Sequence, residues 1–277
     1  MLQSYVLDSV TVLEARHRGA VVVAASHGGV YAGYLAARAN VAAVILNDAG
    51  VGKDEAGIGA LAYLQALGVC AAAVDHASAR IGDGEDMRRS GVLSHVNPLA
   101  RDAGCRQGMY VEEAVTLLRR LPSVESYAVL PVREARQILE PNARIPVIGI
   151  DSVSLLLPED AGALVVAASH GGVLAASQSD GVPFGVAAIS FHDAGGGKND
   201  AGFGRLAPLQ EKGIAAVTVS AGSARIGDAR SCYQSGIISR VNACAAELGA
   251  AVGQPLRLCY ASWLSDRDFG MKEEESL

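Results

Sequence analysis

One polar box occurs twice in this chain, and its residue types could do chemistry. Residues 22–30 and 165–173 share the letters V-V-A-A-S-H-G-G-V. An apolar run followed by Ser, His and two Gly is typical of a strand that turns into a helix. An imidazole there can exchange protons, and N–H groups at a helix start favour an anion or oxyanion. The first site candidates are Ser26, His27, Gly28 and Gly29, and in the second copy Ser169, His170, Gly171 and Gly172.

A purely structural role is the alternative for this box. Ser26 could cap the helix that follows, and the two glycines could simply permit a tight turn. We expect the capping role for the serine rather than a nucleophilic one. For His27 we favour a function, because neither capping nor turning requires an imidazole.

The second repeated box is a glycine-spaced loop with one lysine. It reads D-A-G-V-G-K-D-E-A-G-I-G from Asp48 and D-A-G-G-G-K-N-D-A-G-F-G from Asp193. The two aspartates are catalytic candidates, because a carboxylate at a strand end is costly without a partner or a task. Lys53 and Lys198 could hold an anion as in phosphate-binding loops, or form a surface ion pair with an aspartate of the same loop. Neither a Walker A motif nor a dinucleotide fingerprint is present.

The third box, S-A-R-I-G-D, is identical at Ser78 and Ser223. Arg80 and Arg225 could clamp a carboxylate or phosphate, and Asp83 could orient or cap within the box. The two serines are the candidate hydroxyl partners of the histidines in a Ser–His–acid relay. There is no G-x-S-x-G elbow, so the α/β-hydrolase fold is not indicated.

The copies also differ at strand-end positions, which are Asn47 against His192, Asp75 against Ser220, and His76 against Ala221. His76 and His192 are therefore catalytic candidates of one copy each. Each copy could also supply three nitrogen or oxygen ligands to a divalent metal. No H-x-x-x-H or similar spacing supports that alternative, so no cofactor is identified.

Strand-sized apolar runs alternate with helical spacing along both copies, which predicts an α/β fold. We expect two tandem, pseudo-twofold-related α/β units with mainly parallel sheets, in residues 1–120 and 147–265. An insertion of two residues falls near residues 175–185 of the second copy, since the spacing between the copies grows from 143 to 145 there. Residues 121–146 form a connector with a short helix at 132–139, and the acidic tail 266–277 is expected to fray.

The composition narrows the class of partner. A net charge of −6 argues against non-specific binding to nucleic acid or to an anionic membrane. The five cysteines show no C-x-x-C spacing, and no secretory signal or membrane-length apolar run is visible. We therefore expect a cytoplasmic protein with reduced thiols and a small-molecule partner.

These patterns predict an enzyme, namely a hydrolase of an amide, ester or ring C–N or C–O bond. His27 and His170 would exchange protons, Asp48 and Asp193 would orient them, and the Gly-Gly amides would stabilise an oxyanion. The Lys and Arg candidates would hold substrate charge. The main alternative is a non-catalytic protein that binds a phosphorylated or carboxylated metabolite. A third is an oligomeric structural protein whose boxes only cap helices, and homo-oligomerisation is left open.

Overall fold

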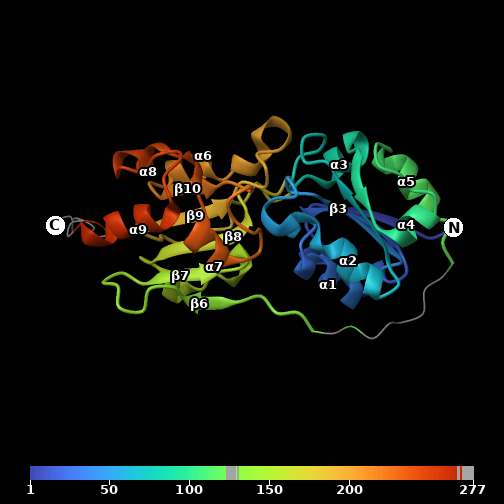
Figure 1. Cartoon of the computed structure of the whole chain (residues 1–277), viewed down its shortest axis with the longest axis horizontal. Helices are drawn as coiled ribbons and strands as arrows, with labels where there is room; N and C mark the ends of the chain where they lie inside the picture. Colours follow the sequence, from blue (N-terminus) through green and yellow to red (C-terminus); the bar gives the residue numbers. More distant parts are fainter. Residues whose placement is uncertain (123–128, 130, 267–268, 270–277) are drawn as a thin grey trace.

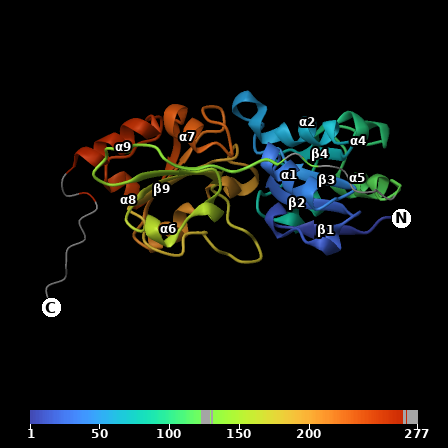
Figure 2. The ribbon, with the colours of Figure 1, turned by 90° about the horizontal axis from the view of Figure 1, so that it is seen from below.

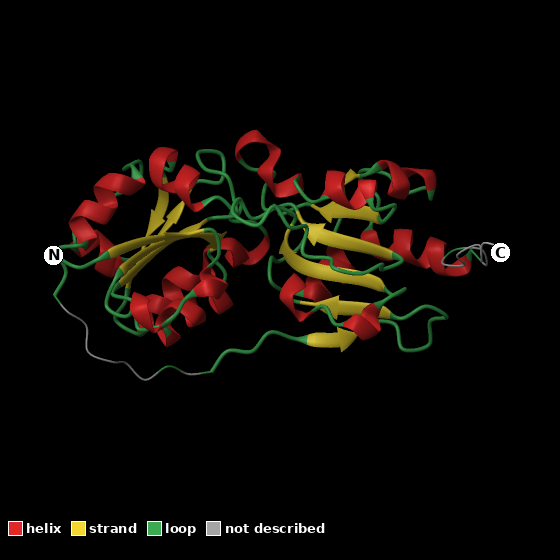
Figure 3. Ribbon diagram, turned by 180° about the vertical axis from the view of Figure 1, so that it is seen from behind, coloured by secondary structure: helices red, strands yellow, loops and turns green. Residues whose placement is uncertain are grey.

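The computed structural model describes residues 1–122, 129, 131–266 and 269. Two α/β units lie side by side along the long axis of the molecule, and the view from below shows the same arrangement (Figures 1 and 2). Each unit is one mainly parallel sheet with helices on both faces (Figure 3). The predicted α/β fold is confirmed. Most of the expected acidic tail lies outside the described residues.

The N-terminal unit contains a sheet of five strands in the order β1-β2-β3-β4-β5. The first four strands are parallel, and the last pairs antiparallel with β4. The strands are β1 Ser4–Leu7, β2 Val21–His27, β3 Ala43–Asn47, β4 Cys70–Val74 and β5 Leu93–Val96. The helices are α1 Val30–Arg38, α2 Gly59–Ala66, α3 Gly84–Ser90, α4 Pro98–Asp102 and α5 Val111–Leu118.

The C-terminal unit contains a sheet of six strands in the order β11-β10-β9-β8-β7-β6. Its strands are β6 Arg136–Ile138, β7 Val147–Ile150, β8 Leu164–His170, β9 Ala188–His192, β10 Ala215–Val219 and β11 Ile238–Val241. Its helices are α6 Leu206–Glu211, α7 Ala229–Ser235, α8 Ala243–Glu247 and α9 Leu256–Ser265. No helix among the described residues is long and apolar enough to cross a bilayer.

The helix predicted at residues 132–139 is wrong, because this stretch contains strand β6, which pairs antiparallel with β7. The Leu139 amide donates to the Val147 carbonyl over 2.8 Å, and the Leu139 side chain lies against Gly149. The edge of β7 offers unpaired backbone groups and a glycine that leaves room for a side chain. Tertiary pairing of this kind outweighs a weak local preference for helix.

Burial explains why the strands are apolar throughout rather than alternating. In β2, every residue from Val21 to Ser26 is buried. Val21 and Val23 face the layer of α3, α4 and α5, whereas Val22 and Ala24 face α1 and α2. A parallel sheet covered on both faces requires this continuous apolar run.

The two units match element by element, except at α1 and at strand β6, which has no counterpart in the N-terminal sheet. The helix expected after the first box forms in the N-terminal unit as α1, but residues 174–187 of the C-terminal unit contain no helix. Arg205 is buried beneath this loop, where Ala60 stands in the other unit. Its Nε donates to the Gly172 carbonyl over 2.9 Å and its Nη1 to the Asp180 carbonyl over 2.8 Å. A buried arginine thus supports the segment that replaces the helix.

The glycine-spaced loops of the two units pack against each other. Gly50 and Gly195 both have left-handed φ angles, +75° and +76°, and a Cβ on Gly50 would lie 2.8 Å from the Gly195 Cα. Only glycine permits this approach. On either side of it, the Lys53 amide donates to the Ala221 carbonyl and the Lys198 amide to the His76 carbonyl, each over 2.8 Å. The units therefore exchange equivalent hydrogen bonds.

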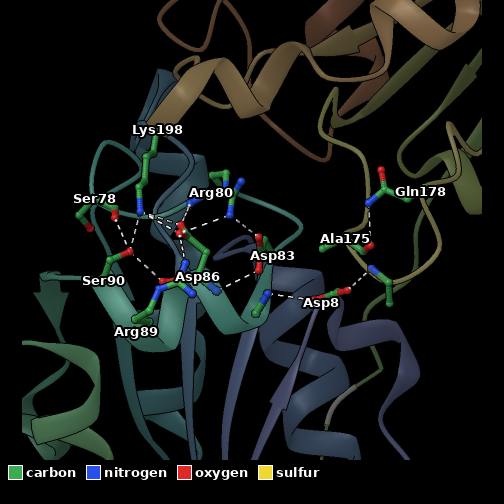
Figure 4. A network of polar contacts seen from close by, with 12 residues as sticks. Asp8, Ser78, Arg80, Asp83, Asp86, Arg89, Ser90, Ala175, Gln178 and Lys198 are labelled. Carbon is green, nitrogen blue, oxygen red and sulfur yellow. Dashed lines mark hydrogen bonds and ion pairs between the residues drawn. The ribbon is translucent and has the colours of Figure 1, made fainter.

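The side chains of these two lysines cross to the opposite unit as well. Lys198 Nζ lies 2.8 Å from Asp86 Oδ1 and 2.7 Å from Ser90 Oγ (Figure 4). Lys53 Nζ donates to Ser235 Oγ over 2.9 Å, the counterpart of the Ser90 contact. Burial alone would raise the pKa of Asp86, but the hydrogen bonds from Lys198 and the Arg80 amide hold it below its usual range. The lysines connect the units and lie outside the cavity described below.

We expect Lys198→Ala to lower the free energy of unfolding by about 2 kcal/mol, because it removes charged hydrogen bonds from the buried Asp86 carboxylate. The matched control, Lys53→Ala, loses a bond to a neutral hydroxyl and should cost about 1 kcal/mol. Urea denaturation of the three proteins measures the difference. Equal losses would contradict the assigned role of Asp86.

Candidate functional site

A cavity of about 150 Å³ lies between the units, and the serine and histidine of both Ser-His-Gly-Gly turns line it. It receives matched residues from the two units together with one residue of the connector. The polar residues among those that line it are Ser9, Thr11, Ser26, His27, Tyr31, Glu134, Ser152, Ser154, Ser169, His170 and Arg205. Four of the sequence candidates, the box serines and histidines, are thus brought to one shared site at the carboxyl ends of β2 and β8.

The two box serines have a structural partner at this site. Ser26 Oγ accepts a hydrogen bond from the Val10 amide over 2.9 Å, and Ser169 Oγ accepts one from the Val153 amide over 3.1 Å. Each serine thereby ties the end of its strand to the 3-10 turn that follows β1 in the N-terminal unit and β7 in the C-terminal unit. The serine does not cap the helix after the box, since the N-cap of α1 is Gly29.

The Gly-Gly amides that were expected to stabilise an oxyanion already have partners within the protein. The Gly28 amide donates to the Asn47 carbonyl over 2.7 Å, and the Gly29 amide donates to His27 Nδ1 over 3.2 Å. A Cβ on Gly28 would lie 2.6 Å from the Gly57 carbonyl oxygen, so the first glycine is needed for backbone packing. Gly171 and Gly172 make the equivalent bonds.

Both histidines of the box are held as neutral rings. Burial lowers the pKa of His27 to about 4, with a further lowering from His192. Burial also lowers the pKa of His170 well below its ordinary value, and the charge of Arg205 adds to this. Because Nδ1 of each ring accepts a backbone N–H, the proton of the neutral form resides on Nε2. Each ring is therefore a hydrogen-bond donor through Nε2.

Glu134 is a residue of this cavity that the sequence did not single out. Burial raises the pKa of its carboxyl to about 7, and the nearby Asp151 raises it further, against a hydrogen bond with Tyr31 that lowers it. Its position is fixed by the next residue, since the Ala135 amide donates to Asp151 Oδ2 over 2.7 Å. Asp8 of the N-terminal unit corresponds to Asp151, and it accepts a hydrogen bond from the Ala176 amide in the same way (Figure 4).

No repeat marks Glu134, because the connector has no counterpart between the copies. The only available signal was an acidic side chain close to a repeated structural unit, which is common on protein surfaces. Tyr31 and Arg205 were overlooked for a related reason. Both belong to the part of the fold in which the units differ.

Asp48 lies outside the cavity and serves the loop contact. Its Oδ1 accepts from the Gly50 and His76 amides, each over 3.0 Å, and lies 2.9 Å from His76 Nδ1. Burial would raise the pKa of Asp48, but hydrogen bonds from His76, Ser94 and Gly50 lower it. The hydrogen bond with Asp48 raises the pKa of His76 in turn. This pair holds the Gly-spaced loop against β4.

One group of side chains could hold a metal ion among the described residues. Ligand atoms of Asp48, Asp75 and His76 lie within 4.8 Å of one another. Asp48 Oδ1 and His76 Nδ1 are joined by a hydrogen bond, and the same Asp48 oxygen accepts hydrogen bonds from two backbone amides. A cation would have to displace these bonds, so the donor set fits an internal ion pair better than a metal centre.

Asp193 and His192 make the corresponding internal bonds in the C-terminal unit. Asp193 Oδ1 accepts from the Gly195 and Ala221 amides, each over 2.9 Å. His192 is fully buried, accepts the Ala194 amide at Nδ1 over 3.0 Å, and reaches the Ala224 carbonyl with Nε2 over 3.1 Å. Burial lowers the pKa of His192, so this ring is neutral.

Asn47 makes the same pair of bonds as His192. Its Oδ1 accepts the Ala49 amide over 2.9 Å, and its Nδ2 donates to the Ala79 carbonyl over 3.3 Å. The imidazole and the carboxamide present an acceptor and a donor at comparable positions. The difference between the copies is therefore conservative in hydrogen bonding.

The serines of the third box form hydrogen bonds with backbone groups of their own unit. Ser78 Oγ donates to the Asp75 carbonyl over 2.7 Å and accepts the Val92 amide over 2.9 Å, and Ser223 makes the equivalent bonds. Arg80 Nη2 lies 2.9 Å from Asp83 Oδ2, beside the Lys198 network (Figure 4). Arg225 lies 3.7 Å from Asp54 of the other unit. None of these residues lines the cavity.

No protein-family model, curated protein sequence or solved structure matches this chain.

Substitutions at His192 test whether its hydrogen bonds are equivalent to those of Asn47. We expect His192→Asn to retain both hydrogen bonds and to cost less than about 1.5 kcal/mol of unfolding free energy. His192→Ala leaves a buried amide and carbonyl unsatisfied beside a cavity, and should cost about 3 kcal/mol or more. Urea denaturation measures both. A loss as large for Asn as for Ala would show that the ring itself is required.

The neutral state of His27 predicts an acid-sensitive stability. Below pH 6.5 the unfolded chain takes up a proton on this residue, whereas the folded chain does so only near pH 4. Folding stability should therefore fall as the pH drops from 6.5 to 4, by up to about 1.4 kcal/mol per pH unit for this group. His27→Gln should show a shallower decline when unfolding is measured across this range. Parallel curves for the two proteins would contradict the assignment.

Proposed function

We propose that this chain is an enzyme that hydrolyses an amide, ester or ring C–N or C–O bond of a small polar molecule in the cavity between the units. The observation that supports this most is the convergence of two neutral histidines, a tyrosine and a glutamate with a pKa of about 7 on one small cavity. Groups with pKa values displaced in this way are typical of catalytic sites.

In this proposal the two histidines are electrophiles rather than bases. A ring whose pKa is about 4 is a poor proton acceptor at neutral pH, but its Nε2–H can polarise a carbonyl. His27 and His170 would donate to the substrate oxygen from the two units and stabilise the negative charge that develops there. They take the role that the sequence analysis assigned to the Gly-Gly amides.

Glu134 would be the general base. A carboxylate with a pKa of about 7 is well matched to proton transfer near neutral pH. It would take a proton from a water molecule as the water oxygen attacks the carbonyl carbon, and return it to the leaving nitrogen or oxygen. Tyr31, which hydrogen-bonds to Glu134, would orient the carboxylate.

The size and composition of the cavity support a small-molecule substrate. About 150 Å³ is below the usual range for drug-sized ligands, so the reacting part of the substrate must be compact.

All five cysteines are free thiols, which is consistent with the cytoplasmic location that we propose.

We expect Glu134→Gln to lower kcat by about 100-fold or more, because the general base is lost. The wild-type rate should rise with pH through about 7, as the carboxyl ionises, and the variant should lack this rise. A pH-stat assay on a panel of small amides, lactams and esters measures both. Glu247→Gln, at the exposed end of α8, is the control.

Two outcomes would overturn the proposal. Full activity in Glu134→Gln would exclude the assigned base. Ligand binding without turnover, lost in His27→Ala, would identify the alternative, a binding protein for a phosphorylated or carboxylated metabolite.

A further inference from the structure

A second concavity adjoins the proposed active site along α1. It has a volume of about 310 Å³, and it shares Val10, Thr11 and Leu35 with the cavity between the units. Tyr31 lines the active-site end, and Arg38 lines the far end. Residues four and seven positions after Tyr31 lie on the same face of a helix, so α1 connects the two spaces. At a rise of about 1.5 Å per residue, Arg38 lies about 10 Å along the helix from Tyr31.

Two arginines from different segments line this second concavity. Arg38 comes from the last turn of α1, and Arg18 follows the 3-10 turn at Ala15–His17. Both side chains belong to exposed residues, and within the described part of the chain neither forms an ion pair with a carboxylate. The one carboxylate on the rim, Glu14, lies 3.3 Å from Arg16. The concavity therefore carries a local positive charge in a chain whose net charge is −6.

A structural role accounts for only one of these charges. Arg38 sits at the carboxyl end of α1, where a cation is favoured by the helix dipole, and it lies 5.6 Å from the Tyr34 ring. Arg18 is the C-cap of a 3-10 turn of three residues, which is too short for a helix dipole that would account for its charge. Two guanidiniums on one concavity can share a single carboxylate or phosphate.

Among the residues that the structure describes, the C-terminal unit has no helix equivalent to α1. The segment after Gly172 forms a loop instead of a helix, and Arg205 is buried against its carbonyl groups. The concavity along α1 thus extends the shared cavity on the side of the N-terminal unit. This gives an otherwise pseudo-symmetric site a single direction.

We propose that the concavity of Arg18 and Arg38 binds an oxyanion group of the substrate, a carboxylate or a phosphate, whose reacting carbonyl lies between His27 and His170 at the Tyr31 end of α1. The inference rests on the proposed function for the identity of the ligand as a substrate. The anion site itself rests on the two arginines and the cavity that they line.

Calorimetric titration with succinate and with inorganic phosphate, at constant ionic strength, tests the site directly. Wild-type protein should bind one of the two anions saturably, and which one binds identifies the chemical class. The affinity should fall at least tenfold in Arg18→Ala and in Arg38→Ala. Arg120→Ala, an exposed arginine of the N-terminal unit that does not line the concavity, should stay within twofold of the wild type.

Steady-state kinetics of the same variants test whether the anion site contributes to substrate binding. For substrates that carry an anionic group, Arg38→Ala should raise KM at least tenfold with little change in kcat, and neutral analogues should be unaffected. Absence of saturable binding of both anions, or unchanged binding in the Arg18→Ala and Arg38→Ala double variant, would overturn the inference.

The two proposals fail separately. If Glu134→Gln retains full activity while anion binding still depends on Arg18 and Arg38, the proposed hydrolysis fails and the anion site stands. If Glu134→Gln loses activity while the arginine variants bind anions as the wild type does, only the anion site fails.

Discussion

The contact between the two glycine-spaced loops is the constraint on which the rest of the molecule depends. Gly50 and Gly195 approach so closely that neither position could carry a Cβ atom without displacing the other loop. On either side, each unit donates one lysine amide to a carbonyl of the other. These loops follow strands β3 and β9, at the carboxyl ends of the parallel strands. Their contact therefore turns the carboxyl ends of both sheets toward one another. The shared cavity is a consequence of that orientation.

Most of the repeated polar residues maintain this arrangement. Asp48 and Asp193 bind backbone amides of the loops, and Lys53 and Lys198 cross to the opposite unit. Polar groups taken out of water must find partners, and here the partners are mostly backbone groups at the strand ends. The repeat therefore reflects the demands of a buried interface as much as those of chemistry.

Several residues with displaced pKa values line the cavity between the units. Not all of them have a counterpart in the other unit. The histidines are matched, and burial keeps both neutral. Glu134 and Tyr31 come from the side of the N-terminal helix α1 and the connector, whereas Arg205 supports the opposite side. A symmetric frame with asymmetric contents can bind a substrate in one orientation. That property underlies both proposals for this protein.

Local pattern in the sequence was sufficient to predict the α/β class, the strand ends that carry the boxes, and the helix that follows the first box, which is α1. It also singled out His27 and His170, which line one cavity in the structure. These features follow from apolar periodicity and turn chemistry, which act between neighbouring residues. The sequence did not reveal which boxes face the cavity, because that depends on how the two units pack.

Tertiary structure alone decided the remaining features. Lys198 finds Asp86 from 112 positions away, a distance over which sequence spacing carries no information. Strand β6 forms where the connector favoured a helix, because the edge of β7 supplies its hydrogen bonds. Glu134 acquires its raised pKa from burial and from Asp151, and neither cause is visible in the residues that flank it. The repeated letters determined the frame, and long-range packing determined which side chains lose water and meet inside it.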